Sequence, residues 1–159
     1  PYYITTPIIM KLLEEKLNIT SITVMIQKEV ADRLIAVPGE KNAGAITYSV
    51  YYYAEAEKVL DVENNSFIPE PSVTSTVIKL NIRKEPVIQI KDEKLMFRII
   101  KQAFMQRRKT LVNALSNMDI FKSKEEIIRM LEDLNINTKV RGEALTIEQY
   151  AQITNYVEK

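Results

Sequence analysis

The sequence predicts an α/β region followed by an all-α region, and three observations indicate this order. Helix-like and strand-like patterns alternate up to residue 83. The composition changes over 83–92, around a central Lys-Glu-Pro, and every later segment has helical spacing. We therefore expect a partial α/β sheet over 1–83 and a small helical domain over 84–159, a division that a chain of 159 residues can accommodate.

Each element of the first region follows from apolar spacing and turn residues. A helix is expected over 7–17, with Thr6 as its N-cap and Pro7 at its first position. The β-branched run 19–26 predicts a buried strand. After it we expect, in order, a helix over 28–37 that ends at Pro38-Gly39, a polar loop over 40–44, a helix over 45–56, a strand over 58–62, a loop over 64–71 and a strand over 72–82.

The second region begins with a helix over 93–104, and 109–115 either continues it or begins another helix. One face of the first helix is apolar and is expected to lie in a core: Met96, Ile99, Ile100 and Ala103. Two further segments have the pattern of capping boxes, Ser123 to Glu126 and Thr146 to Gln149, and predict helices over 127–134 and 150–157.

The composition excludes several kinds of chemistry. The chain has no Cys and no His, which removes disulfides, thiolate metal sites, Cys nucleophiles and His general bases. It has no run of about 18 apolar residues, so no membrane partner is expected. Its three glycines, Gly39, Gly44 and Gly142, form no glycine-rich loop after a strand. We therefore expect no cofactor-binding residue of the nucleotide type in this chain.

Charge is unevenly distributed along the chain. Residues 1–83 carry 8 basic and 10 acidic residues, whereas 84–159 carry 14 and 11. The stretch 94–118 has six cations and no acid. Four of these cations are expected on one helical face, where such a stripe can follow the phosphates of a nucleic acid: Lys94, Arg98, Lys101 and Arg108. The alternative is a solvated surface, although such surfaces usually mix charges of both signs.

Three other segments have both a functional and a structural interpretation. Tyr2, in the initial Pro1-Tyr2 pair, either presents a ring on which a nucleobase can stack or packs at a strand end. Phe67 opens a loop stiffened by two prolines and either faces a ligand or fills the core. The polar segment 27–34 follows the first strand, and it either lines a ligand site or is an ordinary helix N-terminus.

Together these segments resemble the ribosomal RNA adenine dimethyltransferases of the small-subunit, kasugamycin-resistance type. The family's motifs are matched in order along essentially the whole chain. The matching segments are Pro-Tyr at 1–2, which ends the family's Asn-Leu-Pro-Tyr; Gln-Lys-Glu-Val-Ala-x-Arg at 27–33; Pro-Gly-x-Lys-x-x-Gly at 38–44; Phe-x-Pro-x-Pro-x-Val-x-Ser at 67–75; and Ala-Phe-x-Gln-Arg-Arg-Lys-Thr-Leu at 103–111. No single motif identifies the family, but five in the same order do.

This resemblance implies the C-terminal part of a Rossmann-like methyltransferase sheet followed by a small helical domain. It implies transfer of methyl groups from S-adenosylmethionine to two adjacent adenosines near the 3′ end of 16S rRNA. Tyr2 and Phe67 would stack on the target adenine, and Pro1 would belong to the target-base motif. The residues expected to hold the rRNA are Lys28, Arg33, Lys94, Arg98, Lys101, Gln106, Arg107, Arg108 and Lys109.

The same resemblance implies a cytoplasmic protein whose partner is small-subunit rRNA or the 30S precursor, with no membrane, no metal and no obligatory oligomer. The Asn and Leu of the target-base motif and the glycine-rich loop are missing, so we expect a C-terminal portion that is inactive alone. Two alternatives remain. One is the macrolide-resistance dimethyltransferase of 23S rRNA, which lacks the segment matched at 106–110, and the other is a non-catalytic RNA-binding or ribosome-assembly module.

Overall fold

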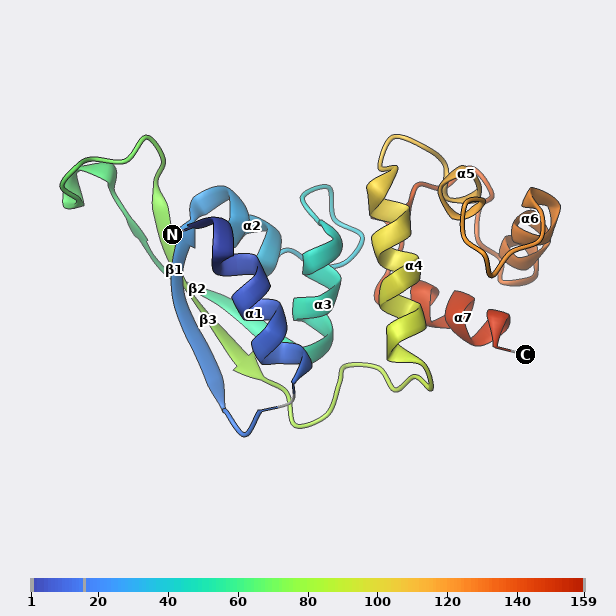
Figure 1. The fold of residues 1–159 in the computed structure, drawn as a ribbon, viewed down its shortest axis with the longest axis horizontal. Coiled ribbons are helices and arrows are strands. Elements are labelled where there is room, and N and C mark those ends of the chain that lie inside the picture. Colours follow the sequence, from blue (N-terminus) through green and yellow to red (C-terminus); the bar gives the residue numbers. More distant parts are fainter. Residues whose placement is uncertain (1, 16, 159) are drawn as a thin grey trace. The chain divides into compact units, whose positions relative to one another are not determined.

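The computed structural model describes residues 2–15 and 17–158 and separates into two compact units. The first unit comprises 1–37 and 46–87, and the second comprises 38–45 and 88–159 (Figure 1). The loop 38–45 therefore packs with the helical unit, although the sequence analysis placed it in the first region. No helix in the described part of the chain has the length and apolar character needed to cross a membrane.

The first unit contains three helices and three strands. Their bounds are α1 Thr5–Glu14, β1 Ser21–Gln27, α2 Lys28–Ile35, α3 Ala45–Tyr53, β2 Ala54–Val62 and β3 Ser75–Ile82, with short 3₁₀ helices at Tyr2–Ile4 and Asn64–Ser66. The expected Thr6 cap is wrong, because α1 begins at Thr5 and its N-cap, Ile4, makes no side-chain hydrogen bond. Pro7 is still tolerated, since the first turn of a helix needs no N–H from it.

The strands form a sheet in the order β1-β3-β2, with β3 antiparallel to both neighbours. β1 and β2 therefore run in the same direction. Gln27 at the end of β1 and Val62 at the end of β2 both pair with Ser75, the first residue of β3. The carboxyl ends of two strands thus meet the amino end of the third along one edge, which we call the Ser75 edge.

The helices α1, α2 and α3 lie together on one face of this sheet (Figure 1). Their apolar side chains and those of the strands form one core of the unit, which includes Ile9, Ile26, Leu34, Ile78 and Leu80. Each fully buried aliphatic side chain of this kind contributes about 1.5–3 kcal/mol to folding. This core fixes the strands, and with them the strand residues that form the Ser75 edge.

Strand β2 begins earlier than expected. The sequence placed 45–56 in a helix, but α3 ends at Tyr53 and β2 begins directly at Ala54. Ala54 and Ala56 pair with Ile82 and Leu80 of β3, so sheet pairing overrides the helical preference of alanine.

The second unit is helical. Its elements are α4 Glu93–Met105, α5 Leu111–Leu115, α6 Lys124–Asp133, a 3₁₀ helix at Gly142–Ala144 and α7 Ile147–Val157. The capping box expected at Thr146 and Gln149 is confirmed. Ser123 caps α6, but the Glu126 carboxylate accepts from the Lys122 N–H, so only half of that expected box forms. Thr110 caps α5, so 109–115 contains the start of a second helix rather than a continuation.

The core of the second unit forms around α4. The four apolar residues expected on one face of this helix are all buried: Met96, Ile99, Ile100 and Ala103. Gly142 lies against them, and the Tyr150 hydroxyl donates a hydrogen bond of 2.9 Å to its carbonyl oxygen. A Cβ at position 142 would lie 2.6 Å from the Ala103 Cβ, closer than side chains approach in folded proteins. Glycine is therefore required here by the close approach of the chain.

Candidate functional site

Tyr2 lies at the Ser75 edge of the first unit. Its hydroxyl group and the Ser75 Oγ are joined by a hydrogen bond of 2.5 Å across 73 residues of sequence. Ser75 is fully buried, whereas Tyr2 is half-buried. The hydroxyl is therefore anchored while part of the ring remains available for contact. Pro1, the other residue of the motif, lies outside the described residues.

Phe67 belongs to the loop that joins the end of β2 to the start of β3 at Ser75. Its N–H donates to the Asn64 carbonyl oxygen at 3.2 Å, which closes the short 3₁₀ turn before it. The Phe67 side chain is half-buried, and the neighbouring Ile68 is fully exposed. The Asn64 Oδ1 is buried and has no hydrogen-bond partner among the described residues, a state that is costly unless something pairs it.

The sequence analysis missed a charged cluster at this edge. Asp61 of β2 accepts hydrogen bonds from Lys58 Nζ at 2.5 Å, Thr76 Oγ1 at 2.7 Å and Lys28 Nζ at 3.2 Å. These bonds, with that from Lys58 the most effective, hold the pKa of Asp61 far below its ordinary value of 3.8. The same contact raises the pKa of Lys58. Asp61 therefore ties α2 and β3 to the end of β2.

The Asp61 cluster predicts an acid-dependent loss of stability. Because the pKa of Asp61 is depressed in the folded state, its contribution is fully present above its ordinary pKa of 3.8 and is lost as the pH falls below it. Asp61→Asn should therefore reduce the difference in unfolding free energy between about pH 6 and about pH 3. Urea unfolding at both pH values measures this difference.

The matched control for Asp61→Asn is Glu14→Gln, which removes an exposed carboxylate from α1. Its acid sensitivity should stay close to that of the parent chain. If Asp61→Asn and the parent chain lose the same stability between the two pH values, the cluster does not stabilise the fold in the way described.

The two basic residues of α2 that were expected to hold the rRNA both have acidic partners. Lys28 contacts Asp61, and Arg33 forms an ion pair of 2.5 Å with Glu29 one turn earlier on the helix. The structural interpretation of segment 27–34 as a helix N-terminus thus explains Lys28 as well as Glu29. The Lys28 side chain remains 44% exposed, so its contact with Asp61 leaves its ammonium open to a second ligand.

The expected stripe of cations on one helical face is partly wrong. Lys94, Arg98 and Lys101 lie on α4, but this helix ends at Met105, and Arg108 follows in the turn beyond it. The helix ends there because the chain turns after Gln106, whose carbonyl oxygen accepts from the Lys109 N–H at 2.8 Å. Arg108 therefore does not share a helical face with Lys94, Arg98 and Lys101.

Acidic residues from other segments neutralise two of these cations. Arg98 forms an ion pair with Asp119, and Arg107 forms one with Glu143. The sequence of 94–118 has no acid, but folding brings acids to it from outside the stretch. The cations that remain exposed, with no ion pair to any described residue, are Lys94, Lys101, Arg108 and Lys109.

The whole chain, residues 1–159, matches the family described as ribosomal RNA adenine dimethylase. The chain belongs to this family. It is 48% identical over 157 residues to the ribosomal RNA small subunit methyltransferase A of Bacillus cytotoxicus, which covers 98% of this chain and 54% of that protein. It is 50% identical over 157 residues to the protein of the same name from Alkaliphilus metalliredigens, covering 99% of this chain and 55% of the relative. The chain thus spans about half the length of these relatives.

Solved structures show that the chain has a methyltransferase fold. A dimethyladenosine transferase from Plasmodium falciparum superimposes with a TM-score of 0.81 at 24% identity, over 99% of this chain and 65% of that one. The 23S rRNA methyltransferase ErmE superimposes with a TM-score of 0.62 at 19% identity, over 100% and 63%. The expected family and the expected fold class, part of a methyltransferase sheet followed by helices, are confirmed.

Membership of the dimethylase family implies the use of S-adenosylmethionine. A nucleotide-type cofactor is usually held by a glycine-rich turn directly after a strand. The three strands end at Gln27, Val62 and Ile82, and the residues that follow them are Lys28, Glu63 and Arg83. The described residues therefore do not fit this requirement. Nor do they contain a cluster of three or more acidic residues that could hold a metal ion.

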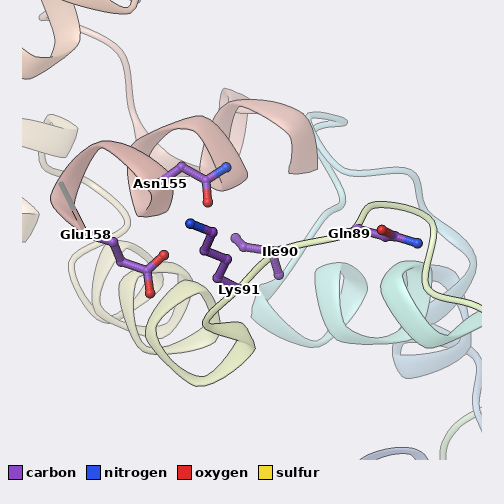
Figure 2. Close-up of a pocket in the computed structure, with 5 residues that line it drawn as sticks. All are labelled: Gln89, Ile90, Lys91, Asn155 and Glu158. Atoms are coloured by element: carbon purple, nitrogen blue, oxygen red, sulfur yellow. The ribbon is translucent and has the colours of Figure 1, made fainter.

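A cavity of about 630 Å³ lies in the second unit, and none of the residues expected to act lines it. It is lined by Gln89, Ile90 and Lys91, which precede α4, and by Asn155 and Glu158 at the end of α7 (Figure 2). Figure 2 shows the Lys91 side chain extending toward the end of α7. None of the sequence motifs falls in this cavity, so it is not part of the candidate site.

Proposed function

We propose that this chain works as part of a small-subunit rRNA adenine dimethyltransferase of about the length of its relatives. The enzyme would transfer methyl groups from S-adenosylmethionine to two adjacent adenosines near the 3′ end of 16S rRNA, in the cytoplasm where the 30S precursor is assembled. The observation that carries this proposal is the identity of 48–50%, over 98–99% of this chain, to proteins named ribosomal RNA small subunit methyltransferase A.

Within this proposal, Tyr2 and Phe67 form the two walls of a slot for the flipped adenine. The hydrogen bond from Tyr2 to buried Ser75 supports this role, because it fixes the ring at the end of a rigid sheet. Phe67 lies on the loop between β2 and β3, the two strands that meet at Ser75, and its half-buried ring is proposed as the second wall for a planar base.

The helical unit is proposed to hold the rRNA. Exposed cations without an acidic partner interact with phosphates more strongly than cations that are already paired. Among the residues expected to hold the rRNA, the stronger phosphate ligands are therefore Lys94, Lys101, Arg108 and Lys109. Arg98 is the weakest member, since phosphate must compete with Asp119 for its guanidinium group.

The alternative with 23S rRNA as substrate is less well supported. The 23S rRNA methyltransferase ErmE resembles this chain at 19% identity, which supports a common fold and no more. Proteins with the small-subunit name are more than twice as similar in sequence.

The test is methyl transfer from labelled S-adenosylmethionine by the full-length protein to separated ribosomal particles. We expect label in the RNA of unmethylated small subunits and none in the RNA of large subunits. Label confined to the large-subunit RNA would establish the 23S alternative. Binding of small-subunit RNA with no transfer to either particle would instead indicate a non-catalytic assembly factor.

A further inference from the structure

Arg107 makes two bonds that the sequence does not reveal. Its Nε pairs with the Glu143 carboxylate, and its Nη2 donates to the Lys41 carbonyl oxygen at 3.0 Å. All three residues belong to the second unit, yet Lys41 precedes Arg107 by 66 residues. The guanidinium group thus joins the loop 38–45 to the 3₁₀ helix that begins at Gly142.

The loop 38–45 is held in place by other contacts as well. Pro38 and Ala43 are buried, and the Ala43 N–H closes a turn on the Glu40 carbonyl oxygen at 3.0 Å. Gly39 has a φ of +94°, and a Cβ there would lie 3.6 Å from the Ala144 carbonyl oxygen. These contacts give the loop 38–45 one defined position, and so they also fix the main chain of Lys41 at its tip.

Lys41 occupies that position with a free side chain. It is exposed and has no ion pair or side-chain hydrogen bond to any described residue. Its main chain lies within hydrogen-bonding distance of Arg107, and Arg108 and Lys109 are the next two residues along the chain. Both of these are exposed cations as well. Folding therefore adds a third unpaired cation to a pair that the sequence places together.

We propose that Lys41, Arg108 and Lys109 form one phosphate-binding surface, and that Arg107 is a positioning residue rather than a phosphate ligand. Arg107 has its Nε committed to Glu143 and one amino group committed to the Lys41 carbonyl oxygen. Its role is to hold the loop that carries Lys41. This inference rests on the proposed function and specifies how the same rRNA interface is built.

The test is the salt dependence of binding between the full-length protein and unmethylated small-subunit RNA. Each lost phosphate contact lowers the slope of log affinity against log salt concentration by about one. Lys41→Met should lower the slope by about one and weaken binding by roughly 3- to 10-fold at about 0.1 M salt. Lys122→Met, which removes an exposed cation before α6, is the matched control and should change neither quantity.

Arg107→Lys separates a positioning role from direct binding. It keeps the positive charge, but a lysine lacks the guanidinium group that contacts both Glu143 and the Lys41 carbonyl oxygen. We expect it to lower the slope as Lys41→Met does, and the double variant to show no further decrease. An unchanged slope in Lys41→Met, or a double variant in which the two effects add, would overturn the inference.

The wild-type protein distinguishes a failure of the inference from a failure of the proposed function. If the wild type neither binds nor methylates small-subunit RNA, the proposed function is wrong and the inference falls with it. If the wild type does both, and Lys41→Met behaves like Lys122→Met, only the inference is wrong.

Discussion

Phe67→Ala in the full-length enzyme is expected to slow methyl transfer by roughly 5- to 150-fold, which corresponds to the loss of about 1–3 kcal/mol of base stacking. Phe67 is half-buried in the loop that leads into β3, so part of its ring already contacts the protein and part is open. Removal of the ring would therefore take away one wall of the proposed adenine slot. Single-turnover methyl transfer to small-subunit particles measures this effect.

Two variants make the result specific to the ring. Phe67→Tyr retains a stacking surface and should keep most of the activity, whereas Val73→Ala, an exposed position on the same loop, should keep all of it. Thermal unfolding of each variant detects any general loss of structure. A Phe67→Ala protein that methylates at the wild-type rate would remove Phe67 from the site.

Gly142→Ala is expected to destabilise the helical unit by about 1–3 kcal/mol, the usual cost of an added methyl group in a packed region. The new Cβ would lie 2.6 Å from the Ala103 Cβ and 2.8 Å from the Tyr150 hydroxyl oxygen. The Ala103 Cβ is fixed directly to the main chain of α4, so it cannot turn away. Urea unfolding of this chain should show a lower midpoint for the variant.

The control for Gly142→Ala is Ala144→Ser, an exposed position two residues away that should leave the midpoint almost unchanged. The conformation of glycine does not explain the expected cost, because among the described glycines only Gly39 has a positive φ. Equal midpoints for Gly142→Ala and the parent chain would show that the segment can move away from α4 at little cost.

Local signals in the sequence were sufficient for most of the helical unit. The apolar face of α4 and the capping box at Thr146 depend on residues three to four positions apart, and both have the expected form. The predicted start of α1, with Thr6 as its N-cap, was wrong because a Thr-Pro pair is compatible with more than one position in the first turn. The early start of β2 could not be seen locally, since Ala54 is a strand residue only because β3 pairs with it.

The candidate site also depends on contacts between residues far apart in the sequence, which local patterns do not reveal. Tyr2 and Phe67 were predicted as site residues because they stand in family motifs, but nothing in the sequence joins Tyr2 to Ser75 across 73 residues. The stretch 94–118 was expected to be strongly basic because it contains no acid, yet Asp119 and Glu143 neutralise two of its arginines. Ion pairs between distant segments depend on the fold, so a local count of charges overestimated the number of unpaired cations in this stretch.

The central claim is that this chain belongs to an enzyme that dimethylates adenine in small-subunit rRNA, and mapping of the modified nucleosides tests it most directly. The full-length protein is incubated with S-adenosylmethionine and unmethylated small-subunit particles, and fragments of the rRNA are analysed by mass spectrometry. We expect dimethyladenosine at two adjacent positions near the 3′ end of the 16S rRNA and nowhere else. If the reaction leaves these two adenosines unmodified, or if the protein modifies 23S rRNA instead, the claim is contradicted.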